Sequence, residues 1–177
     1  MDLNMMLCFL NTKNGKISKQ NNADFRTTAL KLPLIFSDNQ FMHPTTPEQI
    51  TQWIQDSVGT AQDNGFKVVA LRPLEADCVL PYHQNQIRAG GTLSGPTMMT
   101  LADAAMYAAV LSHYGKQLLA VTQDFSIHFL AKPSQNNLQA NAKIIKAGKR
   151  SVVLTVHIYS QDNLVALATG TYAMPTK

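Results

Sequence analysis

One acidic residue stands out because it lies in a long apolar stretch of the chain. Asp103 is the only formally charged residue between Arg88 and Lys116, and its neighbours are mainly alanine, methionine and leucine. The spacing predicts a helix over about residues 96–113 that is apolar nearly all round and enclosed by other elements. An unpaired carboxylate in such surroundings costs several kcal/mol of desolvation, so stability alone does not account for Asp103.

Two interpretations of Asp103 follow from its surroundings. In the functional one, the carboxylate is a general base or nucleophile in a mostly apolar acyl pocket. In the structural one, it faces a polar crevice and accepts hydrogen bonds from Ser, Thr or backbone donors at a subunit boundary. The residues before the helix favour the functional interpretation.

A glycine-rich turn leads into the predicted helix. Gly90 and Gly91 are typical of a tight turn, and Ser94 is in the right place to cap the helix. Gly95 brings bare backbone to the helix N-terminus, where free N–H groups and the helix dipole stabilise an anion. A carbonyl oxygen that gains negative charge during a reaction needs such a donor. Gly95 is therefore the candidate oxyanion-binding residue.

The spacing between these two candidates constrains the assembly. Gly95 and Asp103 are eight residues apart, which is about 12 Å along an α-helix. One carbonyl cannot contact both residues of the same chain. Two such helices running antiparallel across a two-fold axis would bring Gly95 of one chain beside Asp103 of the other. This arrangement predicts an obligate dimer, either alone or as a dimer of dimers.

The elements around the helix predict one α+β domain over residues 45–177. Thr46, Pro47 and Gln49 form a capping signal for a first helix, which Asn64-Gly65 should end. Alternating apolar residues and turn signals then predict strand segments on both sides of the central helix. They lie at residues 66–70, 74–82, 118–130, 138–147, 151–160 and 164–174. Residues 1–44 show no sustained period, and we interpret them as a disordered extension or as sequence upstream of a true start at Met42.

Composition excludes several classes of protein. The formal net charge of +4 is shared evenly, +2 up to Phe41 and +2 over the remainder, which is too dilute for a nucleic-acid-binding face. No stretch is apolar for long enough to span a membrane. With only Cys8 and Cys78, neither a disulfide framework nor metal-ligand spacing exists, and Cys78 falls at a predicted core position. We expect a cytoplasmic protein with no metal and no cofactor.

The sequence resembles the hotdog-fold acyl-CoA thioesterases of the phenylacetate-pathway (PaaI-like) type. The matching segments are RAGGTLSGPTMMTLAD from Arg88, QDFSIHFLAKP from Gln123, KAGKR from Lys146 and ATGTY from Ala168. The resemblance implies a long central helix wrapped by an antiparallel β-sheet and hydrolysis of fatty or aryl acyl-CoA.

Residue by residue, the resemblance implies a catalytic role for Asp103 and an oxyanion role for Gly95. Ser94 stands where that family has a histidine, and it is therefore a further candidate catalytic residue. Arg88 stands where some members have an asparagine that positions the attacking water, and Asn85 or Gln86 could substitute for it. Members often carry Ser or Thr at the position of Thr122, which makes Thr122 another candidate catalytic residue. The alternation of Phe125, Ile127 and Phe129, however, predicts that Thr122 lies on the opposite face of its strand.

A basic turn is the remaining candidate for substrate binding. Lys146, Lys149 and Arg150, with Lys143 nearby, bracket a predicted hairpin turn and would contact the phosphates of coenzyme A. The alternative is an ordinary solvated turn. The expected partner is thus the acyl-CoA substrate, besides further copies of the chain.

Two other functions remain open at this point. A hotdog enoyl-thioester hydratase would need an Asp and a His close together in the loop before the central helix, but residues 88–95 contain neither. A non-catalytic acyl-CoA-binding or regulatory hotdog protein is the other alternative. The first 44 residues contain no helix-turn-helix pattern, which disfavours a DNA-binding regulator.

Overall fold

A computed structural model describes residues 45–176 of the chain, so the predicted extension over residues 1–44 lies outside the described residues. The helices are α1 (Pro47–Ser57), α2 (Gly59–Asp63) and α3 (Gly95–Tyr114), with a 3-10 turn η1 (Gln84–Gln86). The strands are β1 (Lys67–Arg72), β2 (Glu75–Leu80), β3 (Ile87–Arg88), β4 (Thr92–Leu93), β5 (Val121–Phe129), β6 (Leu138–Ala147), β7 (Ser151–Ser160) and β8 (Asn163–Ala173).

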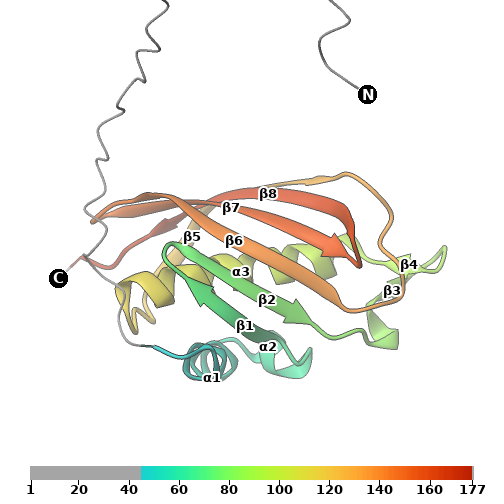
Figure 1. Cartoon of the computed structure of the whole chain (residues 1–177), viewed down its shortest axis with the longest axis horizontal. Helices are drawn as coiled ribbons and strands as arrows, with labels where there is room; N and C mark the ends of the chain where they lie inside the picture. Colours follow the sequence, from blue (N-terminus) through green and yellow to red (C-terminus); the bar gives the residue numbers. More distant parts are fainter. Residues whose placement is uncertain (1–44, 177) are drawn as a thin grey trace, which may run out of the picture. The chain divides into compact units, whose positions relative to one another are not determined.

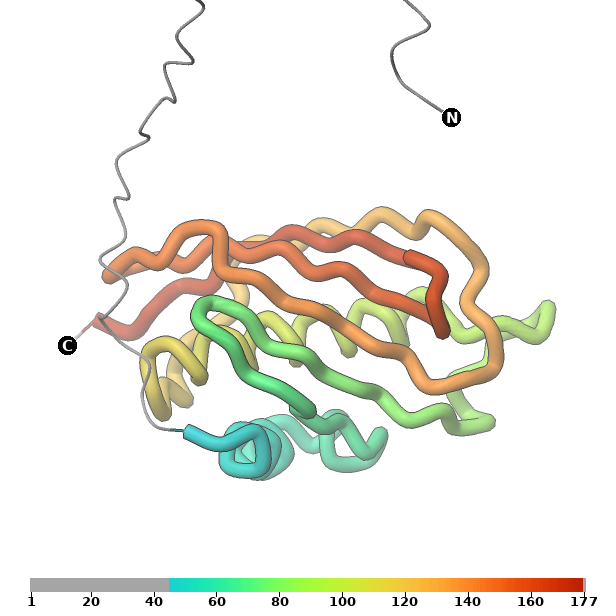
Figure 2. Tube along the Cα trace, in the orientation of Figure 1, coloured from blue at the N-terminus to red at the C-terminus, as the bar shows by residue number. Residues whose placement is uncertain are grey.

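The large sheet has six antiparallel strands in the order β1-β2-β6-β7-β8-β5. Figure 1 shows α3 lying along one face of this sheet, with α1 and α2 beside β1. In Figure 2, β6, β7 and β8 follow one another as neighbouring stretches of chain joined by short turns. A long helix wrapped by an antiparallel sheet confirms the predicted hotdog fold.

The central helix extends one residue beyond each end of its predicted range. Ser94 caps it, because the Ser94 hydroxyl accepts a hydrogen bond from the Thr97 N–H, and Gly115 ends it. Met98 and Met106 are 3% and 0% exposed, which confirms that the helix packs against the sheet. Neither α3 nor any other helix within residues 45–176 is long and apolar enough to cross a membrane.

The helix and the sheet approach each other closely at Gly170 on β8. A Cβ atom there would lie 2.8 Å from Met106 Sδ and 3.0 Å from the backbone oxygen of Asp124. Only glycine leaves room for the Met106 side chain at this contact. Cys78 on β2 is fully buried as predicted, and burial raises the pKa of its thiol far above the usual range.

The first helix begins as predicted but ends earlier. Thr46 and Gln49 form a reciprocal capping box, in which the side chain of each residue accepts from the backbone N–H of the other. The single helix expected up to Asn64 is wrong, because Val58 adopts an extended conformation and separates α1 from α2. The residues at this break, Val58 and Gly59, both have low helix propensity.

The expected loop over residues 88–95 is also more regular than predicted. Its first part is a small hairpin in which Ile87 pairs with Leu93 and Arg88 with Thr92. Gly90 and Gly91 make the turn with φ values of 99° and 73°, which fits their predicted role. The hairpin leads directly to the first residue of α3.

Candidate active site

Asp103 lies on the one stripe of α3 that the sheet leaves partly open. Pro96, Met99, Thr100 and Asp103 recur at helical spacing, so they share a side of the helix. All four are exposed or half-buried, and Met99 is 41% exposed. The elements of its own chain therefore do not enclose the first half of the helix all round. Asp103 is reachable from this side.

Two hydroxyl groups hold one oxygen of the Asp103 carboxylate. The Thr122 hydroxyl on β5 donates to Asp103 Oδ1 at 2.7 Å. The Tyr172 hydroxyl on β8 donates to the same oxygen at 2.8 Å and approaches the Asp103 backbone oxygen at 3.1 Å. Because both donors converge on Oδ1, they fix the orientation of the carboxylate.

The second carboxylate oxygen, Oδ2, is left for other partners. Within residues 45–176 no hydrogen bond or ion pair involves it. In the same part of the chain every buried side-chain nitrogen or oxygen has a hydrogen-bond partner. Because Oδ2 has none, it is not buried and is accessible to solvent. The arrangement is thus a carboxylate with one oxygen held in place and the other facing outward. A general base or nucleophile requires such an arrangement.

A β-bulge brings Thr122 to Asp103. Thr122 pairs with Tyr172, but Asp124 pairs with Thr171, so Gln123 is an extra residue in β5. The extra residue reverses the alternation, and Thr122 shares the helix-facing side with Phe125. The expectation that Thr122 lies on the opposite face was wrong because it assumed an uninterrupted period of two.

Tyr172 is a site residue that the sequence analysis did not select. Its side chain is 3% exposed, and its ring stacks on that of Tyr107 with centroids 5.9 Å apart. Burial, and next the nearby charge of Asp103, raise the pKa of the Tyr172 hydroxyl well above its usual range, so it remains a hydrogen-bond donor. The available sequence signal was its place in the ATGTY segment, where it is the one large residue among small ones. In the structure this tyrosine points toward the helix.

The turn at the start of α3 offers one free backbone donor. Met98 N–H bonds to the Ser94 backbone oxygen, Thr97 N–H bonds to the Ser94 hydroxyl, and Pro96 has no N–H. Within the described residues, the Gly95 N–H is the one donor of this turn without a partner. Ser94 itself acts as the helix cap. A lone N–H at a helix N-terminus fits the predicted oxyanion role of Gly95.

A pocket of about 610 Å³ opens beside this turn. Its lining includes Arg88, Ser94 and Gly95 on one side and Phe129 with Lys132 on the other. The Phe129 ring packs on Gly95, and a Cβ at Gly95 would lie 3.2 Å from Phe129 Cζ. Asp103 does not line this pocket, so one chain keeps the two predicted catalytic groups apart.

The polar residues before the hairpin differ in what they can contact. Asn85 is exposed, whereas Gln86 is 6% exposed. The Gln86 amide accepts from the His83 N–H and donates to the Pro81 backbone oxygen. Gln86 thus holds the turn together, and Asn85 is the one of the pair whose side chain can reach a substrate.

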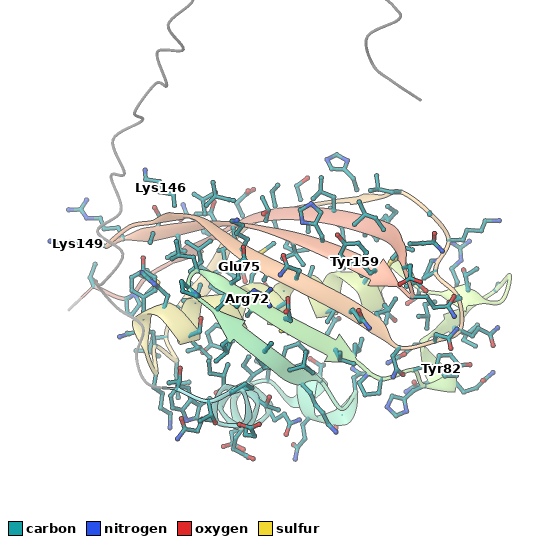
Figure 3. The ribbon with its side chains drawn as sticks, in the orientation of Figure 1. Arg72, Glu75, Tyr82, Lys146, Lys149 and Tyr159 are labelled. Carbon is teal, nitrogen blue, oxygen red and sulfur yellow. The ribbon has the colours of Figure 1, made fainter. Side chains whose placement is uncertain are left out.

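The basic turn lies at the other end of α3. Lys146 and Lys149 extend outward at the β6–β7 turn, at the opposite end of the sheet from Tyr82 (Figure 3). The Tyr114 hydroxyl, in the last residue of α3, donates to the Gly148 backbone oxygen at 3.0 Å and attaches this turn to the helix end. Lys149 and Arg150 are exposed, and no ion pair within residues 45–176 involves them or Lys146. In a single chain, Gly95 therefore lies at the start of α3, Asp103 lies near its middle, and the basic turn lies beside its end.

The polar groups around Asp103 are hydroxyls rather than metal ligands. In the part of the chain that the structure describes, no three His, Cys, Asp or Glu side chains are grouped closely enough to hold a metal ion. The chemistry that this arrangement can support is proton transfer or nucleophilic attack by one carboxylate, helped by a backbone donor.

Comparison with known proteins gives a consistent family assignment. The sequence model of the thioesterase superfamily matches residues 90–167. A protein from Silicibacter sp. described as a thioesterase is 32% identical, with a TM-score of 0.70, over 77% of this chain and 97% of its own. A conserved Pseudomonas aeruginosa protein is 27% identical, with a TM-score of 0.62, over 66% of this chain and 93% of its own. The PaaI protein of the E. coli phenylacetic acid degradation operon shares the fold, with 22% identity and a TM-score of 0.65 over 73% of this chain and 94% of its own. No curated protein matches the sequence.

Proposed function

The chain belongs to the thioesterase superfamily, and we propose that it hydrolyses acyl-CoA thioesters with Asp103 as the reacting carboxylate. The observation that carries this proposal is the Asp103 carboxylate itself. Two hydroxyl groups hold Oδ1, while Oδ2 is open on the uncovered stripe of α3. A carboxylate that is oriented through one oxygen and open at the other supports proton transfer or nucleophilic attack.

The proposed step needs no cofactor. Asp103 Oδ2 takes a proton from a water molecule, whose oxygen bonds to the thioester carbonyl carbon. The Gly95 N–H stabilises the negative charge that develops on the carbonyl oxygen. The C–S bond then breaks, and the CoA thiolate receives a proton to leave as the thiol beside the carboxylic acid product. In the alternative route, Oδ2 attacks the carbonyl carbon directly and water then hydrolyses the resulting anhydride.

We propose that the complete site contains residues of two chains. The distance of about 12 Å along α3 keeps Gly95 and Asp103 of one chain from contacting the same carbonyl. The open stripe of α3 is the surface on which a second helix would bring Gly95 of the partner subunit to Asp103. The partly exposed apolar Met99 on that stripe supports this contact. A homodimer is thus the smallest active unit, and a dimer of dimers remains compatible with it.

The same antiparallel arrangement would bring the basic turn of one chain toward the Gly95 end of the other. Lys146, Lys149 and Arg150 make no ion pairs within the described residues, so their charges are available for a ligand. We assign them to the phosphates of coenzyme A, and Asn85 remains the candidate for positioning the attacking water. Arginine and lysine are the side chains that bind phosphate in proteins.

A thiol-release assay over acyl-CoA substrates of increasing chain length, with aryl acyl groups included, tests the activity. We expect turnover with at least one class and its loss in Asp103→Asn. Tight binding of acyl-CoA by the wild type without thiol release at any chain length would instead identify a binding protein. Single turnover in heavy-oxygen water separates the two routes, because only the nucleophilic route places enzyme oxygen in the first product.

Subunit complementation tests the composite site. Gly95→Pro removes the N–H, and proline is compatible with the first position of a helix. Ser94, with φ −79° and ψ 155°, already has the conformation preferred before proline. We expect mixed dimers of Gly95→Pro and Asp103→Asn chains to regain part of the activity that each variant lacks. Gly95→Ala is the control, because it adds the same contact with Phe129 but keeps the N–H.

A further inference from the structure

The pocket beside Gly95 combines apolar walls with positive charge. Its apolar lining comes from Leu93, Pro96, Met98, Phe129, Leu130, Ala131 and Pro133. Among residues 45–176, the only charged residues in the lining are Arg88, from the β3–β4 hairpin, and Lys132, from the segment after β5. Both are cations, and the pocket has no carboxylate of its own. Phe129 and Leu130 are 50% and 54% exposed, so a ligand here would cover apolar surface.

These two cations are not neutralised by the chain. Within residues 45–176 neither Arg88 nor Lys132 takes part in an ion pair, and the one hydrogen bond of the Arg88 side chain goes to the backbone oxygen of Ala89. By contrast, Arg72 and Lys143 on β1 and β6 are both paired with carboxylates. The positive end of the α3 dipole at Gly95 adds to the same field. The pocket is therefore suited to an anion that also has an apolar part.

We propose that this pocket takes an acyl group with a negatively charged end, so that the preferred substrates are CoA monothioesters of dicarboxylic acids. This inference rests on the proposed function. With the thioester carbonyl at Gly95, the methylene groups of the acyl chain lie along Phe129 and Leu130. The terminal carboxylate then reaches Arg88, whose planar guanidinium can bind it with two parallel hydrogen bonds, and Lys132 adds a second positive charge.

A phosphate of coenzyme A is the other source of negative charge. The pantetheine arm separates the thioester sulfur from the nearest phosphate by a long chain of single bonds. Arg88 lines the same pocket as Gly95. Because the arm is long, an extended arm that starts at Gly95 places its phosphates outside this pocket. In the proposed dimer those phosphates meet the basic turn at Lys146–Arg150 of the other chain, whose residues do not line this pocket. The anion in the pocket therefore belongs to the acyl side of the thioester.

Paired substrates of equal chain length test the inference. Glutaryl-CoA and valeryl-CoA, or adipyl-CoA and hexanoyl-CoA, differ only in the terminal carboxylate. We expect kcat/KM to be higher by about tenfold or more for the dicarboxylic member, the usual range for a hydrogen-bonded charge pair. In Arg88→Gln this ratio should fall to near one, through loss of the dicarboxylic activity alone. Arg88→Lys should retain part of it, and Lys132→Gln should lower it severalfold.

The matched control is Lys67→Gln on β1. Lys67 is exposed and does not line the pocket, so its loss removes one positive charge without touching the site. We expect this variant to keep the wild-type ratio for both substrate pairs. A fall equal to that in Lys132→Gln would show that only the general charge of the protein matters, and would overturn the proposal.

Inhibition by free CoA separates the two sources of negative charge. If Arg88 binds a phosphate, Arg88→Gln weakens CoA inhibition and lowers kcat/KM equally for both members of each pair, which overturns the inference. Wild-type turnover that favours valeryl-CoA or hexanoyl-CoA also overturns it, while leaving the thioesterase function in place. Absence of thiol release from every substrate contradicts the proposed function itself and the inference with it.

Discussion

The two halves of α3 differ in how deeply their side chains are buried and in which polar groups they leave accessible. From Ala104 to Leu111 every residue is at most 9% exposed, and small side chains let β8 approach closely enough that Gly170 contacts Met106. The first half, from Gly95 to Asp103, has an open stripe, a free N–H and the only carboxylate of the helix. The second half serves packing, and the first half keeps polar groups accessible at some cost in stability. Substitutions in the two halves should therefore affect different quantities.

The largest effect should follow from removing the charge of Asp103. Asp103→Asn keeps the shape of the side chain and one acceptor oxygen for Thr122 and Tyr172. We expect kcat to fall by about a hundredfold or more, since a positioned acid–base group contributes roughly 10²–10⁴. Thermal unfolding, size-exclusion mass and acyl-CoA affinity should stay close to those of the wild type.

The matched control is Asp162→Asn, in the exposed β7–β8 turn. It removes the same charge from a residue that is outside α3 and does not line the pocket beside Gly95, so activity should not change. If Asp103→Asn lowered stability or assembly while turnover per folded dimer stayed near wild type, Asp103 would be structural. The contrast between the two halves of α3 would then be wrong.

The packed half should respond in stability rather than in turnover. Gly170→Ala places a Cβ 2.8 Å from the buried Met106 Sδ, and overpacking of this kind typically costs about 1–3 kcal/mol. Urea unfolding measures the loss, and kcat per folded protein should be preserved. Gly59→Ala, whose Cβ would have no neighbour within 4 Å, is the control and should be neutral or slightly stabilising. Equal effects of the two variants would contradict the close approach of β8 to α3.

Tyr172 connects the two halves, because it packs in the core and bonds to Asp103. Tyr172→Phe removes one of the two donors to Oδ1 and keeps most of the packing. We expect kcat to fall about tenfold, because the carboxylate loses one of the two donors that orient it. Thr122→Val should act in the same direction. A change in KM alone would contradict a role in positioning Asp103.

Local sequence rules predicted most of the elements and selected Asp103 as the candidate catalytic residue. The isolated charge of Asp103, the cap at Ser94 and the turn glycines Gly90 and Gly91 can each be recognised within a few residues of sequence. The patterns predicted one α+β domain, and the hotdog arrangement followed from the resemblance to the thioesterases. These features depend on short-range geometry, which sequence patterns record.

The features that the sequence did not predict depend on strand pairing and tertiary packing. The bulge at Gln123 exists because β5 and β8 pair with one extra residue, and no local signal marks it. Without the bulge, Thr122 could not be assigned to the helix side. The Tyr172 hydroxyl reaches Asp103 only because α3 lies close against β8. At Val58 the continuous apolar stripe favoured one helix, whereas the low helix propensity of Val58 and Gly59 favoured a break.

The smallest expected effect is a dependence of stability on alkaline pH. Burial raises the pKa of the Tyr172 hydroxyl above its unfolded value of about 10, so the folded state keeps this proton when the unfolded state loses it. The stability that depends on the proton is fully present below pH 10 and is lost as the pH rises further. At pH 10.5 the loss from one such group is about 0.8 kcal/mol.

Tyr172→Phe has no proton to lose, so its urea-unfolding free energy should fall less between pH 8 and pH 10.5 than that of the wild type. Tyr107 and Tyr114, whose pKa values burial also raises, remain in both proteins and cancel in the difference. An identical fall in both proteins would show that water reaches the Tyr172 hydroxyl. It would also show that β8 does not exclude water from this side of the site.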